Sequence, residues 1–255
     1  AAKGNSMSTQ KQTAVSGIID LLKTLLVAGA IAVGFRSFVA EPFNIPSGSM
    51  IPTLLVGDYL FVTKYSYGYS RYSFPFGLGP IRDRVFSEER KPQRGQVAVF
   101  RLPSDTSVDY IKRVIGLPGD RIQVRRGLLH INGQPVERRM IGNGMHTVSG
   151  GEQMTTLYQE TLPEGKIHLI QEVSDQQIFD NTPEFVVPAG HYFMMGDNRD
   201  NSRDSRSSSV GFVPLKNFIG EAQFLFFSHD YSASIWEIWN WPSAIRFGRL
   251  GNTIE

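Results

Sequence analysis

The chain has 255 residues, which is enough for one large domain or two small ones with a proper hydrophobic core. Its 26 basic and 24 acidic residues leave a net charge of +2, too even a balance for the basic surface of a nucleic-acid-binding protein. The absence of cysteine excludes a disulfide framework, a thiol nucleophile and Cys-based metal sites. Aromatic residues make up 11% of the chain and accompany many Val and Ile runs, which excludes intrinsic disorder.

A long apolar segment, GIIDLLKTLLVAGAIAVGFRSFVA, occupies residues 17–40. As a helix it would reach about 36 Å, and the hydrocarbon core of a bilayer is about 30 Å thick. Asp20 and Lys23 lie three residues apart near its start, where they can pair. We predict a transmembrane helix, with a buried or interfacial helix as the alternative. A cleavable signal peptide is disfavoured because charges interrupt the segment and no small-x-small exit follows.

The charges around this segment predict its orientation. Lysines precede it, so the positive-inside rule places residues 1–16 in the cytoplasm as a short tail. Residues 41–255 are then expected on the other side of the membrane as one extracytoplasmic domain. Residues 1–6 precede Met7 and are interpreted as a remnant of expression.

After Glu41 the periodicity of the sequence changes from helical to alternating. Short segments rich in Val, Ile and Phe are separated by Gly, Pro and Asn turns, which predicts a mostly-β domain. Residues 121–187 are more polar and less regular, with flexible stretches expected at Gly142–Gly144 and Gly150–Gly151, and are interpreted as an insertion or subdomain. Residues 64–91 are interpreted as a packed loop. The predicted strands are Tyr59–Val62, Gln96–Phe100, Val108–Ile115, Arg121–Val124, Leu128–Ile131, Tyr192–Met195 and Glu221–Phe227.

The segment EPFNIPSGSMIPTL follows the apolar helix directly, at residues 41–54. Its three prolines prevent a helix and favour an extended backbone, with a turn at Ser47-Gly48-Ser49. A serine after a glycine can present its hydroxyl and its backbone N–H together. Taken alone, however, the triplet fits an ordinary Ser/Gly loop.

The segment VDYIKRVI, residues 108–115, contains a lysine within an apolar pattern. In a strand, Lys112 shares its face with Val108, Tyr110 and Val114, where an ammonium group is poorly solvated. Desolvation lowers a lysine pKa from about 10.4, and a lysine brought to about 8 can accept a proton from a serine. The alternative is an edge-strand lysine that extends its amine to solvent.

The segment GDNRDNSRDSR, residues 196–206, alternates charges of both signs with hydrogen-bonding side chains. Calcium binding is disfavoured because Arg199 and Arg203 interrupt the loop and no Glu closes the twelfth position. A buried turn held by ion pairs fits better, with Asp204 and Arg206 as one pair. The five histidines are scattered without HExxH spacing, so we expect no metal site and no histidine-based triad.

Four segments in this order behind an apolar helix resemble the ordered motifs of bacterial type I signal peptidases: SGSMIPTL, RGQVAVF (Arg94–Phe100), DYIKRVIGLPGD (Asp109–Asp120) and GDNRDNSRDSR. The resemblance covers the helix and most of residues 41–227, and is weakest over residues 121–187. It implies a signal-peptidase-like antiparallel β-domain, with a smaller β insertion subdomain, behind one transmembrane helix. It also implies a serine endopeptidase with a Ser–Lys dyad and an acyl-enzyme intermediate.

The resemblance assigns roles to single residues. Ser49 matches the nucleophile and Lys112 the general base, and Ser202 matches a serine that orients the lysine amine. Ser47 matches the serine whose hydroxyl forms the oxyanion hole with the backbone N–H of Ser49. Structural ion pairs are implied between Arg113 and Asp197 and between Asp204 and Arg206.

The resemblance also implies how substrates bind. An extended peptide would lie between residues 41–45 and 109–112 as an added strand. Shallow pockets there would admit only small side chains, which would give cleavage after an Ala-x-Ala pattern. The residues matched to substrate binding are Phe43, Ile45, Pro46, Met50, Leu54, Val99, Asp109, Tyr110 and Ile111. The implied partners are signal peptides of exported preproteins, the lipid bilayer and the secretion translocase, with no nucleic acid and no cofactor or metal. The implied location is the bacterial inner membrane.

Some features depart from the family pattern or leave alternatives open. Gln96 replaces the usual acidic residue and is interpreted as structural, and the geometry of Ser207–Ser209 is not predicted. The tryptophans at 236, 239 and 241 belong either to the core or to a patch at the bilayer interface. Two other functions stay open: a specialised Ser–Lys processing peptidase, and a catalytically inactive membrane-anchored binding domain.

Overall fold

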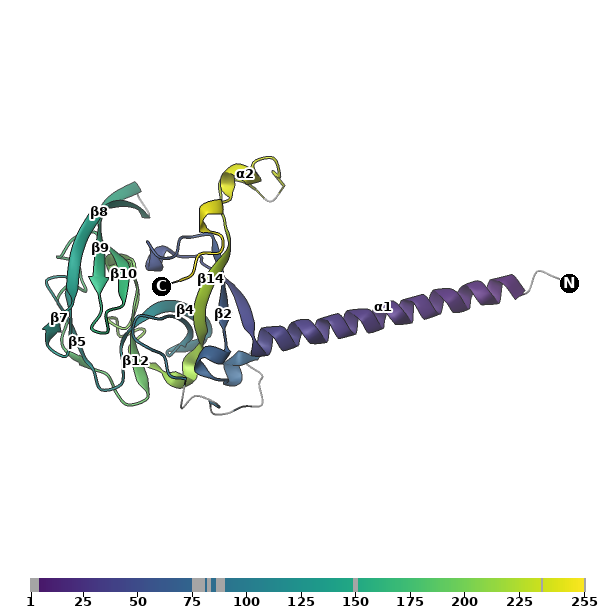
Figure 1. Ribbon diagram of the computed structural model, residues 1–255, viewed down its shortest axis with the longest axis horizontal. Coiled ribbons are helices and arrows are strands. Elements are labelled where there is room, and N and C mark those ends of the chain that lie inside the picture. The colour runs from purple at the N-terminus through teal and green to yellow at the C-terminus, as the bar shows by residue number, and fades with distance from the viewer. Residues whose placement is uncertain are drawn as a thin grey trace.

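The first element, α1, is a single helix from Asn5 to Phe38 that leads away from the rest of the chain (Figure 1). The computed structural model describes residues 5–74, 81, 84–85, 90–148, 151–234 and 236–254. Within α1, Gly17–Phe38 has a mean hydropathy of 2.0 and is long and apolar enough to cross a membrane. The predicted span of residues 17–40 is thus helical up to Phe38. Ala40 instead begins a strand, since Pro42 cannot continue a helix.

Seven strands form the main sheet, in the order β1-β2-β14-β3-β4-β12-β13. Neighbouring strands in this sheet are antiparallel, as the resemblance implied. Their bounds are β1 Ala40–Asn44, β2 Asp58–Thr63, β3 Val97–Leu102, β4 Asp105–Gly116, β12 His191–Met195, β13 Val213–Pro214 and β14 Phe218–Ser228.

Residues 121–187 contain seven further strands, in agreement with the β insertion that the resemblance implied, and more than the two strands that the sequence pattern predicted there. They form a four-stranded sheet, β11-β5-β6-β7, and a three-stranded sheet, β10-β9-β8. Strand β8 includes Gly142–Gly144, which the sequence predicts to be flexible, because its backbone pairs with β9 on both sides of a register shift between Met140 and Gly142. The bounds are β5 Arg121–Arg125, β6 Leu128–Ile131, β7 Gln134–Pro135, β8 Glu137–Val148, β9 Gly151–Thr161, β10 Ile167–Glu172 and β11 Phe185–Val186.

Short helices connect these strands. The described helices other than α1 are α2 Trp241–Ala244 and the 3-10 turns η1 Gly48–Met50, η2 Tyr65–Tyr67, η3 Arg71–Ser73, η5 Arg199–Asn201, η6 Leu215–Asn217 and η7 Phe247–Arg249. The predicted loop of residues 64–91 contains η2 and η3, and part of it lies outside the described residues.

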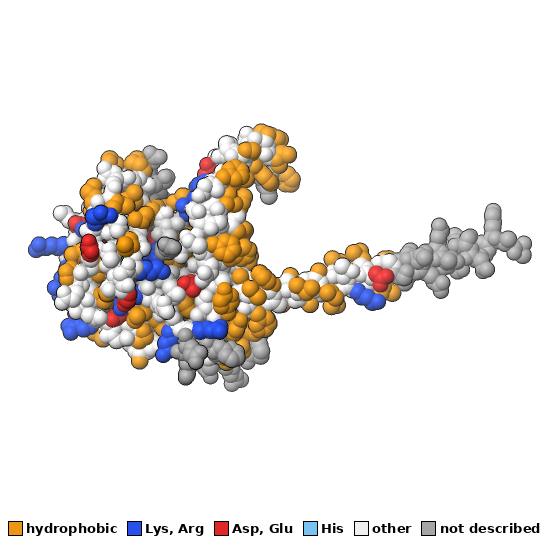
Figure 2. All heavy atoms as spheres, in the orientation of Figure 1, with side chains coloured by type: hydrophobic (Ala, Val, Ile, Leu, Met, Phe, Trp, Pro, Cys, Tyr) orange, Lys and Arg blue, Asp and Glu red, His pale blue; other side chains and the backbone are white. Residues whose placement is uncertain are grey.

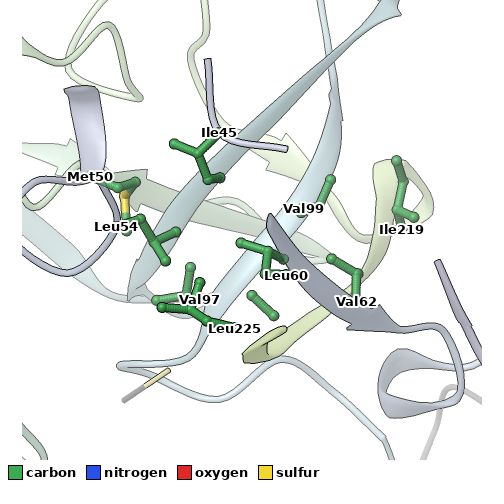
Figure 3. Packing of buried hydrophobic residues seen from close by; sticks show 10 residues of the cluster. Ile45, Met50, Leu54, Leu60, Val62, Val97, Val99, Ile219 and Leu225 are labelled. Atoms are coloured by element: carbon green, nitrogen blue, oxygen red, sulfur yellow. The ribbon is translucent and has the colours of Figure 1, made fainter. Parts of the chain in front are cut away.

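A buried apolar cluster supports the segment that follows α1 (Figure 3). Burying an Ile, Leu or Met side chain contributes about 1.5–3 kcal/mol, so this cluster holds the segment firmly against the sheet. Its members are Ile45, Met50, Leu54, Leu60, Val62, Val97, Val99, Ile219, Ala222 and Leu225. A second cluster, which includes Ile115, Ile122 and Phe193, packs the four-stranded sheet against β4 and β12. The insertion is therefore fixed to the same core that carries β4.

Candidate active site

A groove of about 570 Å³ lies between the segment after α1 and strand β4. Seven of the nine predicted substrate-binding residues line it: Phe43, Ile45, Pro46, Val99, Asp109, Tyr110 and Ile111. Met50 and Leu54 do not. Both are fully buried in the apolar cluster beneath the groove, because their side chains point to the sheet instead (Figure 3). These two residues therefore support the groove from below and do not line it.

Two strand edges face this groove. In the described part of the chain, β1 pairs with β2 alone, and β12 pairs with β4 only along Arg113–Gly116. The edge of β4 before Arg113 that faces away from β3 is therefore open, as is the outer edge of β1. Unpaired N–H and C=O groups on such edges can accept an extended peptide as an added strand.

Ser49 and Lys112 meet inside the groove. Lys112 Nζ donates to Ser49 Oγ at 2.7 Å and to the carbonyl oxygen of Ile111 at 2.8 Å. Both side chains are buried, with exposed fractions of 8% for Ser49 and 4% for Lys112. Burial lowers the pKa of Lys112 to about 8, although the carboxylates of Asp204 and Asp197 act in the opposite direction. At pH 7 about one-tenth of Lys112 is therefore uncharged, far more than for a lysine with the ordinary pKa of about 10.4.

Alternation along β4 sends the next side chain to the other face. Arg113 Nε and Nη2 donate to the two carboxylate oxygens of Asp197 at 2.8 and 2.7 Å, and both residues are fully buried. Thr53 Oγ1 also donates to Asp197 at 2.5 Å. Burial would raise the pKa of Asp197, but the charge and hydrogen bonds of Arg113 hold it below its ordinary value. The segment after η1 is thus locked to β4 and to residue 197.

A second buried ion pair organises residues 196–206. Arg206 Nε and Nη2 donate to Asp204 at 2.9 and 2.8 Å. Asp204 also accepts a bond from the backbone N–H of Gly196 at 3.0 Å, which closes the segment into a compact turn. Both ion pairs that the resemblance implied are therefore present in the structure.

Ser202 lies against this turn, next to the backbone of Ser49. A Cβ placed on Gly196 would be 2.2 Å from Ser202 Oγ and 2.5 Å from the Ser49 carbonyl oxygen, so only glycine permits this close approach. Ser202 is buried, and its Oγ forms no hydrogen bond with any described residue. The implied bond from Lys112 to Ser202 is therefore not formed in the structure. Ser47 lines the groove two residues before Ser49.

Three residues at the site were not predicted. Asn198 holds the turn against the serine segment: its Nδ2 donates to the Gly48 carbonyl oxygen at 3.0 Å, and its backbone N–H donates to the Ser49 carbonyl oxygen at 3.2 Å. Asn201 and Arg203 line the groove. Exposed and buried side chains alternate only over residues 201–204, after a 3-10 turn, so the sequence carries no clear signal for either residue.

Comparison with known proteins identifies the family. A family model described as "Signal peptidase, peptidase S26" matches residues 18–227. The chain belongs to this signal peptidase family. The signal peptidase I of Rickettsia typhi is 46% identical over 207 residues, covering 78% of this chain and 76% of the relative. That of Rickettsia conorii is 46% identical over 235 residues, covering 89% and 83%. A solved signal peptidase I from Enterococcus faecalis matches at 27% identity and a TM-score of 0.31, over 51% of this chain and 96% of that chain.

Family membership makes the chain a peptidase that cleaves signal peptides, and it confirms the resemblance of the four segments. The fold prediction is also confirmed, since antiparallel sheets follow one N-terminal apolar helix. Together with that helix, membership indicates a membrane-anchored signal peptidase. Within the described residues, no three His, Asp or Glu side chains gather where they could hold a metal ion.

The two departures from the family pattern have local structural explanations. Gln96 Oε1 accepts bonds from the Tyr67 hydroxyl at 3.2 Å and from the Gln93 backbone at 2.8 Å, away from the groove of this signal peptidase. Ser207–Ser209 form a turn in which the backbone N–H of Ser207 donates to the Asp204 carbonyl oxygen at 2.9 Å. Both features stabilise loops and do not line the groove.

Proposed function

We propose that this signal peptidase uses Ser49 as its nucleophile and Lys112 as its general base. The observation that carries the proposal is the 2.7 Å contact between Lys112 Nζ and Ser49 Oγ within the groove. An amine with a pKa of about 8 is neutral often enough near neutral pH to take the hydroxyl proton. Among the described residues, no histidine lines the groove to serve instead.

The reaction proceeds through an acyl-enzyme. Ser49 Oγ attacks the carbonyl carbon of the scissile bond while its proton passes to Lys112 Nζ. The carbon–nitrogen bond then breaks, the leaving amine of the mature protein takes the proton from Lys112, and the signal peptide stays esterified to Ser49. A water molecule then gives a proton to Lys112 Nζ and attacks the ester carbon. The bond to Ser49 Oγ breaks, and Lys112 returns the proton to Ser49 as the signal peptide leaves with a free carboxyl group.

Ser47 and Ser202 support these steps. The Ser47 hydroxyl and the Ser49 backbone N–H are the proposed donors to the oxyanion, and removal of one such donor in a serine protease costs about 10²–10³ in kcat. Ser202 is buried beside the Ser49 backbone, and its Oγ has no partner among the described residues, so it is available to hold the Lys112 amine. The ion pairs of Arg113 and Asp204 keep these elements in place.

The substrate is an extended peptide between the open edges of β1 and β4. Main-chain bonds to the edges provide affinity, and alternate side chains enter the apolar pockets beside Ile45 and Ile111. These shallow pockets favour small residues, which matches cleavage after an Ala-x-Ala pattern. Residues 41–255 act as the catalytic domain on the outer face of the plasma membrane, with residues 1–16 cytoplasmic and residues 17–40 as the membrane span.

The test is cleavage of a fluorogenic peptide with an Ala-x-Ala site by the full chain in detergent. Lys112→Ala should lower kcat/KM by about 10²–10⁴, the usual contribution of a general base, and Ser49→Ala should lower it further because the nucleophile itself is lost. Matched controls are Ser232→Ala and Lys216→Ala, two exposed positions that do not line the groove and should retain wild-type activity.

Full activity in Lys112→Ala would refute the dyad. If the folded wild type cleaves no Ala-x-Ala peptide while it cleaves one particular preprotein, a specialised processing peptidase replaces the proposal. Binding of signal peptides without any cleavage would favour the inactive binding domain.

A further inference from the structure

Arg203 presents a positive charge to the groove that the proposed mechanism does not use. Around Ser202 the backbone is extended, with φ −131° and ψ 123°, so successive side chains alternate. Ser202 and Asp204 are buried, whereas Asn201 and Arg203 are exposed and line the groove. In the described part of the chain, the Arg203 guanidinium forms no hydrogen bond or ion pair.

The sheet topology shows at which end of the groove this charge lies. Each pairing that links β1 to β4 through β2, β14 and β3 is antiparallel, so β1 and β4 run in the same direction. Asp109 lies within electrostatic range of Glu41, at the start of β1, and of its partner Lys64. From this end of the groove the two strands lead toward Ser49 and Lys112. Arg203 follows Ser202, beside Ser49, and so belongs to the catalytic end.

The other charged groups of the groove do not cancel this charge. Among the described lining residues they are Asp109 and Lys112. Asp109 is at the opposite end and pairs with Arg101 at 3.1 Å. Lys112 is buried and engaged with Ser49. A peptide that leaves the groove past Ser49 thus meets one accessible charge, and it is positive.

We infer that Arg203 is a specificity-determining residue, which favours substrates with acidic residues, and disfavours those with basic residues, just after the scissile bond. This inference rests on the proposed function: the small-residue pockets beside Ile45 and Ile111 hold the residues before that bond. The start of the mature protein must then pass Arg203. A carboxylate at this point gains a favourable charge contact, and an ammonium group is repelled.

The experiment uses Ala-x-Ala fluorogenic peptides that differ only at the second residue after the scissile bond, with Asp, Asn or Lys there. The full chain in detergent at low salt should show kcat/KM about three- to tenfold higher for Asp than for Lys, since exposed charge pairs have modest effects. The ratio should fall to about 1 in Arg203→Gln and invert in Arg203→Glu. Salt near 0.5 M should reduce it, because screening weakens exposed charges.

The matched control is Arg125→Glu, the same change at an exposed arginine of β5 that does not line the groove, and it should keep the wild-type ratio. An Asp-to-Lys ratio that stays at the wild-type value in Arg203→Glu, with cleavage still abolished by Ser49→Ala, would overturn the role of Arg203 and leave the proposed function intact. Absence of Ser49-dependent cleavage would overturn both.

Discussion

Buried carboxylates near Lys112 are each neutralised by an arginine. Asp197 is paired with Arg113 and Asp204 with Arg206, both with two hydrogen bonds in buried surroundings. An unpaired carboxylate at either place would favour the charged lysine and raise its pKa. These ion pairs therefore shape the turn and also limit the negative potential at the amine, which leaves burial as the dominant influence on Lys112.

The pH dependence of cleavage follows from this lysine. Below a pKa of about 8, Lys112 is protonated and cannot accept the Ser49 proton, so kcat/KM should rise between pH 6 and 9 with a midpoint near 8. The measurement is kcat/KM for an Ala-x-Ala peptide across pH 6–10, with Lys216→Ala as the control that keeps the same profile. A flat profile, or a midpoint near the ordinary lysine value of about 10.4, would contradict the assignment.

At the scale of elements, strands β9 and β10 of the insertion form a buried support for residues 197–206. Arg199 Nη1 donates to Glu160 of β9 at 2.9 Å, and its Nη2 bonds the other oxygen. The backbone N–H of Gln171 in β10 donates to the Asp197 carbonyl oxygen at 2.8 Å. Arg206 in turn donates to the Arg199 carbonyl oxygen at 2.6 Å. Hydrogen bonds thus connect the insertion directly to the turn that contains Ser202.

Loss of the Glu160 charge should weaken this support. Glu160→Gln leaves the buried Arg199 without its counter-charge, and breaking a buried pair from one side costs about 3–5 kcal/mol. Urea unfolding of the full chain in detergent measures the effect, and peptide cleavage should fall with it because the turn loses its anchor. Glu137→Gln, at an exposed position on β8, is the control. Equal stabilities for the two variants would show that the Glu160 pair does not anchor the turn.

At the scale of the whole molecule, aromatic side chains form a band along one flank of the domain. Ring contacts link Tyr59 and Phe61 of β2 with Phe224, Phe226 and Phe227 of β14. Figure 2 shows hydrophobic side chains on the flank from which α1 departs and on the projecting C-terminal segment. In that segment Trp236, Trp239 and Trp241 have exposed fractions of 83%, 73% and 41%, so the alternative of a core position is wrong.

These tryptophans favour the alternative of a patch at the bilayer interface, because Trp is enriched at that depth. They are the three tryptophans of the chain, so tryptophan fluorescence, excited selectively over that of tyrosine, reports this segment alone. On transfer of the full chain from detergent to lipid vesicles, we expect a blue shift and quenching by brominated lipids. Unchanged emission, with free access of a water-soluble quencher to the indoles, would count against the patch.

Local patterns were sufficient for much of the fold. Strands β2, β4 and β14 of the main sheet were predicted because alternation of apolar and polar residues, and the turn residues beside it, are local sequence signals. Strands β8 and β9 were not, since they expose much of their surface and are held by pairing with each other. The sequence of such a hairpin shows little alternation of apolar and polar residues, because neither face is buried throughout.

The sequence by itself determined the family, the apolar helix and the residues of the proposed dyad, because these depend on ordered motifs and on composition over short windows. Only the tertiary structure decided that Met50 and Leu54 are buried beneath the groove, that Arg203 lines it, and that Glu160 supports its turn. Side-chain direction and burial at these positions depend on strands far apart in the chain. Long-range packing, which no local pattern encodes, sets them.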